Sequence, residues 1–144
     1  MSNTIAEQVL ASIAATLTAA ASMSGATVFR ERKDALALGE GIAVVLEPEV
    51  EEYRKISDYH MSVDLMCIFN ILVRGNVPNT TADPIRVAMH SLIMADPTIG
   101  GLVQRVIPHA TNWAYEEADI TAAVLECRYR FVFACKTNNL TMAA

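Results

Sequence analysis

Apolar and other residues alternate with a period of two over residues 59–74. Every odd position from 61 to 73 is apolar, and the polar residues in the segment fall on even positions: Ser62, Asp64, Asn70 and Arg74. A period of two is typical of a β-strand with one buried face. The sixteen residues would extend about 50 Å at ~3.3 Å each. We therefore expect this long strand to bend or to contain a bulge.

The other strands are predicted from weaker patterns. Residues 121–136 repeat the alternation and predict a second long strand. Residues 102–115 predict a third strand, and Pro108 within it indicates a sheet edge or a bulge. Residues 116–119 predict the turn that follows this strand. Residues 41–46 are apolar throughout, as in a strand buried on both faces, and Pro48 is expected to end it. Residues 26–32 predict a short strand, separated from the next by a turn at Gly39 and Gly41.

Two segments have the period of an amphipathic helix. Thr4 and Glu7 have the spacing of a capping box, and apolar residues recur every four positions after them. A helix of about five turns is therefore expected before Gly25. Asp83 and Pro84 predict the start of the second helix. Apolar residues at 85, 88, 89, 92 and 93 continue it to the Asp-Pro pair at 96–97.

The order α-β-β-β-α-β-β predicts an α+β fold. Strands that follow one another closely favour a mostly antiparallel, mixed sheet of about five strands, with two α-helices packed on one face. The chain of 144 residues is of single-domain length, since domains span about 100–200 residues. We expect residues 1–136 to form one α+β domain and residues 137–144 a polar C-terminal tail.

The chain is acidic and rich in apolar residues. Lys and Arg number 11 against 16 Asp and Glu, a formal net charge of −5, and 53% of the residues are hydrophobic against 19% charged. Globular domains have about 25% charged residues, so this chain has little charge with which to cover a monomer's surface. The apolar surplus favours burial between subunits. The net negative charge argues against a nucleic-acid-binding protein that depends on neutralising phosphate groups.

Neither membrane insertion nor secretion is expected. The longest apolar stretch, residues 5–23, contains Glu7, Gln8 and several hydroxyl residues, and its many alanines make it a poor membrane span. No Lys or Arg precedes Arg30, so the basic segment of a signal peptide is missing. Three cysteines without CxxC spacing favour synthesis in a reducing compartment.

No motif in the sequence indicates catalysis or cofactor binding. The P-loop, GxSxG, HExxH and EF-hand patterns are missing, and the glycines at 39 and 41 lack the third glycine of a dinucleotide site. His60, His90 and His109 have no metal-ligand spacing. The cysteines lie on apolar faces of predicted strands, away from cations. We predict no catalytic residue, no cofactor and no metal site, and we do not expect an enzyme, although a site assembled across the fold leaves no such motif.

Two groups of charged residues are candidate interaction sites. One is basic and comprises Arg30, Arg32 and Lys33. The other is a predicted acidic loop with Glu47, Glu49, Glu51 and Glu52. Both groups could simply be solvated surfaces. They could also be complementary patches between the subunits of a ring, because a head-to-tail contact requires two different surfaces. The acidic loop could instead line a pore through which DNA slides, since a negative wall repels phosphate.

The order of the elements and several short segments carry a family resemblance. An Ala-rich N-terminal helix precedes TVFRERKDAL and GIAVVLEPE; then come the long alternating strand, a helix ending in ADPTIGGL, and a hairpin with NWAYEEAD before AVLECRYRFVF. Over residues 1–136 this layout resembles the tail terminator (tail completion) proteins of long-tailed bacteriophages. The ADPTIGGL segment and the YRFVF ending of the last strand carry most of the likeness.

The resemblance implies a structural virion protein, made in the host bacterial cytoplasm, that forms a hexameric ring at the head-proximal end of the tail tube. Such a ring stops tube polymerisation and provides the surface to which the head joins, while DNA passes through its lumen without specific binding. The implied partners are further copies of the chain, the tail tube protein and the head–tail connector or neck protein. The resemblance implies no catalysis and no membrane contact, and it assigns no role to a particular residue.

Three other functions remain open from the sequence. A neck or head-completion adaptor of the same phage machinery would also form a ring. A small-molecule-binding or enzymatic α+β domain would be a low-order oligomer with a pocket of convergent polar groups. A DNA-binding protein would bind duplex DNA with an affinity that falls as salt rises.

Overall fold

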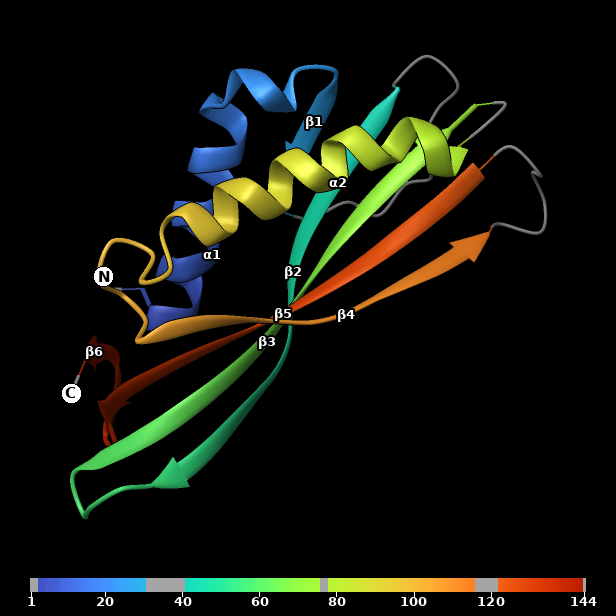
Figure 1. The fold of residues 1–144 in the computed structure, drawn as a ribbon. Coiled ribbons are helices and arrows are strands. Elements are labelled where there is room, and N and C mark those ends of the chain that lie inside the picture. The colour runs from blue at the N-terminus through green and yellow to red at the C-terminus, as the bar shows by residue number, and fades with distance from the viewer. Residues whose placement is uncertain (1–2, 31–40, 76–77, 116–121, 144) are drawn as a thin grey trace.

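Two helices cover one face of a six-stranded mixed sheet (Figure 1). The computed structural model describes residues 3–30, 41–75, 78–115 and 122–143. The elements are α1 (Ile5–Ala19), the short 3-10 helix η1 (Ala21–Met23), β1 (Ala26–Phe29), β2 (Ile42–Lys55), β3 (His60–Arg74), α2 (Pro78–Ala95), β4 (Arg105–Tyr115), β5 (Ala122–Lys136) and β6 (Asn139–Ala143). The strand order is β1-β2-β3-β5-β4, with β6 paired to β5. The predicted α+β class is confirmed, with one strand more than expected.

The two alternating segments form the centre of the sheet as β3 and β5. They pair antiparallel without a register shift, from His60 opposite Lys136 to Arg74 opposite Ala122. The odd positions of both strands are buried, as the alternation predicted. Of the bend or bulge expected in this strand, the bulge is absent from β3, because its pairing with β5 has no register shift. The strand accommodates its length by the strong twist visible in Figure 1, since strands twist about their own axes.

The first helix begins as predicted but is shorter. The Oγ1 atom of Thr4 accepts a hydrogen bond from the backbone N–H of Glu7 at 3.1 Å. The carboxylate of Glu7 turns away toward Arg30, so only half of the capping box forms. The helix ends at Ala19 because Ala20 has an extended backbone, with ψ of 130°. Gly25, expected to end the helix, follows η1 and has a φ of +93°, a conformation that favours glycine.

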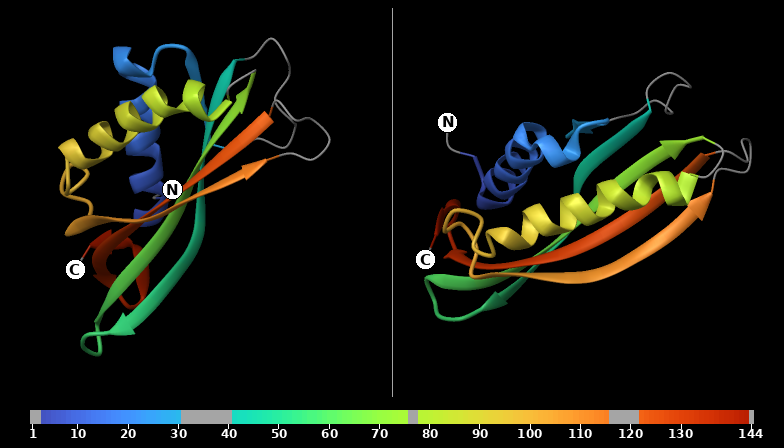
Figure 2. Two further views of the ribbon diagram at one scale, coloured as in Figure 1. Left: turned by 45° about the vertical axis from the view of Figure 1, so that its right-hand side comes forward. Right: turned by 45° about the horizontal axis from the view of Figure 1, so that its top comes forward.

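The second helix is longer than predicted at its start. It begins at Pro78, and Pro84 lies inside it. A proline removes one backbone hydrogen bond, and the helix continues through this position. It ends at Ala95, before the Asp-Pro pair, as predicted. The two helices lie on the same face of the sheet in all views (Figures 1 and 2).

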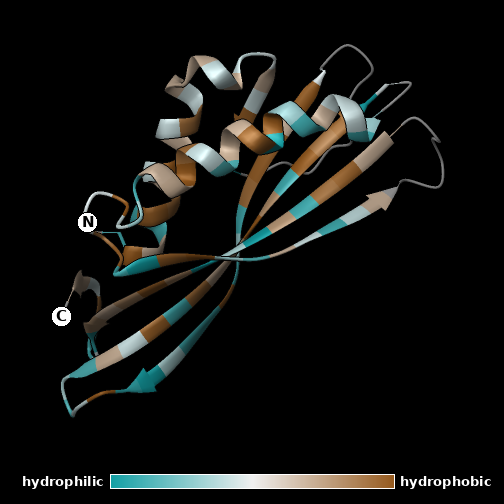
Figure 3. Cartoon of the chain, in the orientation of Figure 1, coloured by the Kyte–Doolittle hydropathy of each residue, from teal (hydrophilic) through white to brown (hydrophobic). Residues whose placement is uncertain are grey.

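The hydrophobic core lies between these helices and the sheet. It joins the buried stripe of α1 and that of α2 to the odd positions of β3 and β5. At its centre the ring of Phe69 stacks on Tyr129, with centroids 5.4 Å apart, and lies 6.3 Å from the ring of Phe131. Figure 3 shows the hydrophobic colours on the strands beneath the helices and hydrophilic colours where β2 extends beyond them.

The prediction for β2 was wrong in one respect: Pro48 does not end the strand. β2 continues to Lys55 with a register shift between Pro48 and Val50. β1 pairs in parallel with residues 42–45, so among the strands that the structure describes Pro48 of β2 has a neighbour on one side, β3. A proline is tolerated on such an outer strand, because its missing N–H interrupts no second ladder. The predicted acidic loop is therefore part of an edge strand.

The strand predicted over residues 26–32 is present as β1 over residues 26–29. The rest of that prediction, and the turn expected at Gly39, lie mostly outside the described residues.

The end of the chain also differs from the prediction. Pro108 lies on an outer strand next to a register shift, as predicted for β4. The turn predicted over residues 116–119 lies outside the described residues. The predicted polar tail contains a strand, because β4 pairs with β5 only up to Val132 and leaves the end of β5 free for β6. The Asn139 side chain supports the return of the chain by accepting hydrogen bonds from the N–H and Oγ1 of Thr141, at 3.0 and 2.6 Å.

Candidate functional site

The acidic residues singled out by the sequence lie on the free edge of β2, defined here as residues 47–55. Along this edge β3 is the paired neighbour on one side, and β1 ends before it begins. Most of its side chains are exposed. An exposed strand edge invites pairing with other chains, and charges, prolines and bulges oppose such pairing. The free edge of β2 has all three, so a contact here would use side chains more than backbone hydrogen bonds.

Glu49 is already engaged within the subunit. Its carboxylate accepts hydrogen bonds from the Nε of Arg128 at 3.2 Å, and the Nη2 of the same residue lies 3.1 Å away. This hydrogen bond raises the pKa of the Arg128 guanidinium. Glu51 accepts a hydrogen bond from the hydroxyl of Tyr53 at 3.0 Å. Glu47 is half-buried and Glu52 is exposed, so the four carboxylates predicted as one group have different environments.

Arg30, which directly follows β1, has a partner within the subunit on α1. Its Nη1 and Nη2 donate to the two carboxylate oxygens of Glu7 at 2.9 and 2.8 Å. This bidentate pair ties the chain after β1 to the first turn of α1, and its hydrogen bonds lower the pKa of the Glu7 carboxyl. The other two members of the predicted basic group, Arg32 and Lys33, lie outside the described residues.

Removing the Arg30–Glu7 pair should cost little stability. Both side chains are partly exposed, at 30% and 47%, and exposed pairs contribute about 0.2–1 kcal/mol. We expect a coupling in this range at pH 7 from urea unfolding of wild type, Arg30→Met, Glu7→Gln and the double variant. Because the folded pKa of Glu7 is lowered, the coupling is present above its ordinary value of 4.5 and is lost as the pH falls through the folded value. An Arg30→Met variant with full stability but altered self-association would instead assign Arg30 to an interface.

The face of the sheet opposite the helices carries charges whose sign changes from one edge to the other. Acidic side chains lie on the β2 side of this face: Glu49, Glu52 and Asp64. Basic side chains lie on the β4 side: Arg105, Arg128 and Arg130. Arg130 donates to Asp64 at 2.6 Å across β5 and β3. Exceptions to the gradient are Arg54, Arg74 and Glu126. The uncovered face thus changes from mainly acidic side chains toward β2 to mainly basic ones toward β4, and the pairs Glu49–Arg128 and Asp64–Arg130 neutralise part of this charge within the subunit.

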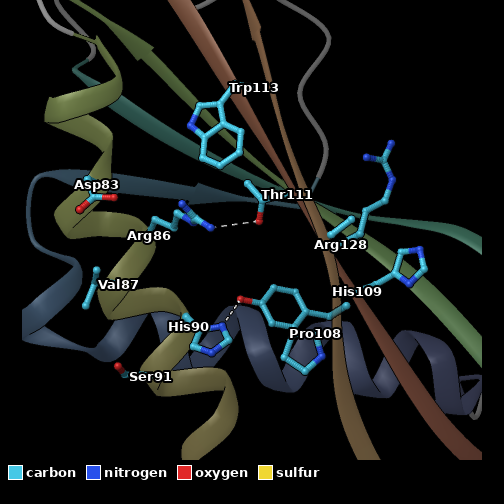
Figure 4. A pocket seen from close by; sticks show the side chains of 12 residues that line it. Asp83, Arg86, Val87, His90, Ser91, Pro108, His109, Thr111, Trp113 and Arg128 are labelled. Carbon is cyan, nitrogen blue, oxygen red and sulfur yellow. Dashed lines mark hydrogen bonds between the residues drawn. The ribbon is translucent and has the colours of Figure 1, made fainter.

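A groove lies between α2 and β4 on the helix face, with a volume of about 530 Å³ (Figure 4). Arg86 reaches across it, with a long 3.5 Å hydrogen bond to the Oγ1 of Thr111 and its guanidinium 5.0 Å from the ring of Trp113. Nδ1 of His90 lies 2.7 Å from the hydroxyl of Tyr129. Burial raises the pKa of Tyr129 to about 12, so its hydroxyl keeps its proton at neutral pH. We call this the α2–β4 groove.

Sequence reasoning missed this groove. Its walls come from three consecutive elements, α2, β4 and β5, and pairing of β4 with β5 and packing of α2 on the sheet bring their side chains together. The partial signals were Trp113, the chain's single tryptophan, and His90. Figure 4 also shows the side chains of His109 and Arg128 pointing away from α2, whereas Arg86 extends from α2 toward Thr111.

The turn between β2 and β3 forms an apolar tip at the end of a projecting hairpin. Ile56 is 60% and Tyr59 77% exposed. The turn is held by backbone hydrogen bonds from Ile56 and Ser57 to the carbonyl of His60, both 3.0 Å long. Lys55 and Asp58 form an ion pair at 3.0 Å on its surface. We call residues 55–59 the hairpin tip.

Other kinds of site find no support in the described part of the chain. Within residues 3–30, 41–75, 78–115 and 122–143, no three His, Cys, Asp or Glu side chains lie close enough to hold a metal ion. No helix in these same ranges is long and apolar enough to cross a membrane. The thiols of Cys67, Cys127 and Cys135 are free and buried, and burial raises the pKa of each.

Comparison with known proteins adds no relative: no protein-family model matches the sequence, and no curated protein matches it significantly.

Proposed function

We propose that this chain is a tail terminator subunit, which forms a ring at the head-proximal end of a phage tail tube. The observation that carries the proposal is the change of charge across the uncovered face, from acidic at β2 to basic at β4. A ring is built from head-to-tail contacts between two unlike surfaces. Copies placed side by side would bring the acidic edge of one against the basic edge of the next, and opposite charges set the register of such contacts.

The composition and the family resemblance support the same proposal. The chain has more apolar residues and fewer charges than a lone domain of its size needs. Two of the segments that carry the resemblance lie at structurally defined places: AVLECRYRFVF includes most of β5, and ADPTIGGL spans the end of α2 and the turn after it. The ring would stop tube polymerisation and present a surface to the head–tail connector, with DNA passing through its lumen.

The test is a tube-capping assay with purified protein. Tail tube protein is polymerised with and without the chain, and the products are observed by negative-stain electron microscopy. We expect rings at one end of the tubes and arrested growth at that end. Tubes that grow to the same lengths with bare ends would overturn the proposal. Binding to connector rings without binding to tubes would favour the alternative, a neck or head-completion adaptor.

Reversing charge on the free edge of β2 should impair assembly without unfolding the subunit. In the variant Glu52→Lys, a positive charge on the uncovered face would meet the basic edge of the neighbouring copy, and like charges in a contact cost several kcal/mol. We expect ring formation, followed by light scattering, to require at least about tenfold more protein. Glu52→Gln, which removes the charge at equal size, should lie between this variant and wild type. Unchanged assembly in both would exclude this edge from the contact.

The α2–β4 groove favours a second candidate, a domain that binds a small anion. Its volume of about 530 Å³ falls within the range of about 300–1,000 Å³ usual for ligand sites. Arg86, His90 and Tyr129 supply convergent polar groups. A screen of small carboxylates and phosphates by thermal shift would detect such binding, and a monomeric protein with a tight ligand would favour this candidate over the ring.

A further inference from the structure

We propose that the hairpin tip of one copy of this chain docks into the α2–β4 groove of the next copy. The inference rests on the proposed ring and names the contact that would hold it together. Exposed large apolar side chains among the described residues fall in three places. Val50, Tyr53, Ile56 and Tyr59 lie on the β2–β3 hairpin; Val87 and Trp113 lie at the groove; Leu140 and Met142 lie on β6.

The tip and the groove are complementary in apolar surface. The tip presents Ile56 and Tyr59, which have lost little surface within their own subunit. Val87 and Trp113, on the groove walls, are 58% and 50% exposed. Exposed apolar patches of this kind mark interaction sites. An aromatic anchor entering a pocket is the usual centre of a protein–protein contact.

The charges of the two surfaces are also complementary in sign. Lys55 and Asp58 stand three residues apart on the tip. Asp83 and Arg86 stand three residues apart on α2, one helical turn from each other, and both line the groove. Docking can therefore place Lys55 near Asp83 and Asp58 near Arg86. The Lys55–Asp58 pair is 72% and 80% exposed. An exposed pair of this kind contributes little, so exchanging partners loses little.

The positions of the two surfaces require a second copy as the occupant. The hairpin tip projects at one end of the sheet, whereas α2 and the end of β4 lie toward the other (Figures 1 and 2). A chain therefore cannot fill its own groove with its own tip. The contact joins two different surfaces, so it can repeat head to tail from copy to copy, and such a series forms a ring where its rotation closes.

The first test is a charge swap across the contact. Asp58→Arg and Arg86→Asp should each raise the protein concentration needed for assembly by about tenfold or more, because each places like charges together. The double variant carries both swapped groups on every copy and should recover most of the loss. Light scattering over a concentration series measures assembly, and circular dichroism confirms that each variant is folded. Single variants that assemble like wild type would overturn the inference.

The second test is disulfide trapping, which also reports on a transient contact. Because the chain's three cysteines are buried, introduced thiols would react selectively. Tyr59→Cys mixed with Val87→Cys should form a disulfide-linked dimer at least about tenfold faster than Tyr59→Cys mixed with Thr18→Cys, because docking raises the effective concentration of one thiol near the other. Thr18 is the control because it lies at an exposed position on α1, away from the proposed contact. Equal rates overturn the docking whether or not rings form. If rings form without this link, the docking is wrong and the ring proposal stands. Failure of the ring proposal itself is measured separately, by the tube-capping assay.

Discussion

The Phe69→Ala variant is expected to lose about 3–5 kcal/mol of unfolding free energy, the range for deleting a fully buried aromatic side chain. Phe69 has no exposed surface, and its ring contacts those of Tyr129 and Phe131 at the centre of the core. The loss combines the transfer free energy of the ring with a cavity that these neighbours cannot close, because β3 and β5 pair along their whole length. Urea unfolding of the dissociated subunit measures it.

Tyr59→Ala is the matched control for this prediction. Its side chain is 77% exposed, so its removal should change the unfolding free energy by no more than about 0.5 kcal/mol. A loss below about 1.5 kcal/mol in Phe69→Ala would mean that the core repacks around the gap more easily than its geometry indicates.

Alkaline pH should destabilise the fold through two buried groups. Burial raises the pKa of the Cys67 thiol from 9.0 to about 12, and that of the Tyr129 hydroxyl from 10.0 to about 12. Below pH 9 both groups are neutral in the folded and unfolded chain, and their contribution is fully present. As the pH rises the unfolded chain ionises first, so stability falls by roughly 1 kcal/mol per pH unit or more for the Cys67 thiol above pH 9 and for the Tyr129 hydroxyl above pH 10. Urea unfolding should show a loss of roughly 4 kcal/mol between pH 8 and 11.

Two variants separate the contributions of these groups. Cys67→Ala and Tyr129→Phe should each lower stability at pH 8 and make its decline with pH shallower, because each removes one group that titrates. The buried thiols of Cys127 and Cys135 act in the same direction and leave a residual slope. Stability that stays constant from pH 8 to 11 in the wild type would contradict the assignment of these groups to the water-excluded core.

The sequence predicted the two central strands of the sheet correctly. It was less accurate for strands at the sides of the sheet, where it missed the second half of β2 and all of β6. The alternation in β3 and β5 was readable because one face of each strand is buried along its whole length. The continuation of β2 beyond Pro48 was not readable, because local rules treat proline as a strand terminator. The strand continues because β3 supplies a partner up to Lys55. β6 was missed for a similar reason: it exists where β4 leaves the end of β5 unpaired.

The candidate sites depended still more on the fold. The sequence identified the charged residues but not their partners: Arg30 pairs with Glu7, and Glu49 pairs with Arg128. These partners are 23 and 79 residues apart along the chain, and no local spacing encodes such distances. The change of sign across the uncovered face and the α2–β4 groove arise only when the strands are placed in their spatial order.

By itself the sequence determined the α+β class, the buried face of each long strand, the helix end at the Asp-Pro pair and the surplus of apolar residues. These properties follow from local periodicity and composition, which act before any long-range contact forms. Only the tertiary structure decided which strands are outer, where charged residues find partners, and that the hairpin tip lies at one end of the sheet while α2 and the end of β4 lie toward the other. Strand order and cross-strand pairing are set by contacts between segments distant in sequence, so the surfaces that could join one copy to the next became visible only in the fold.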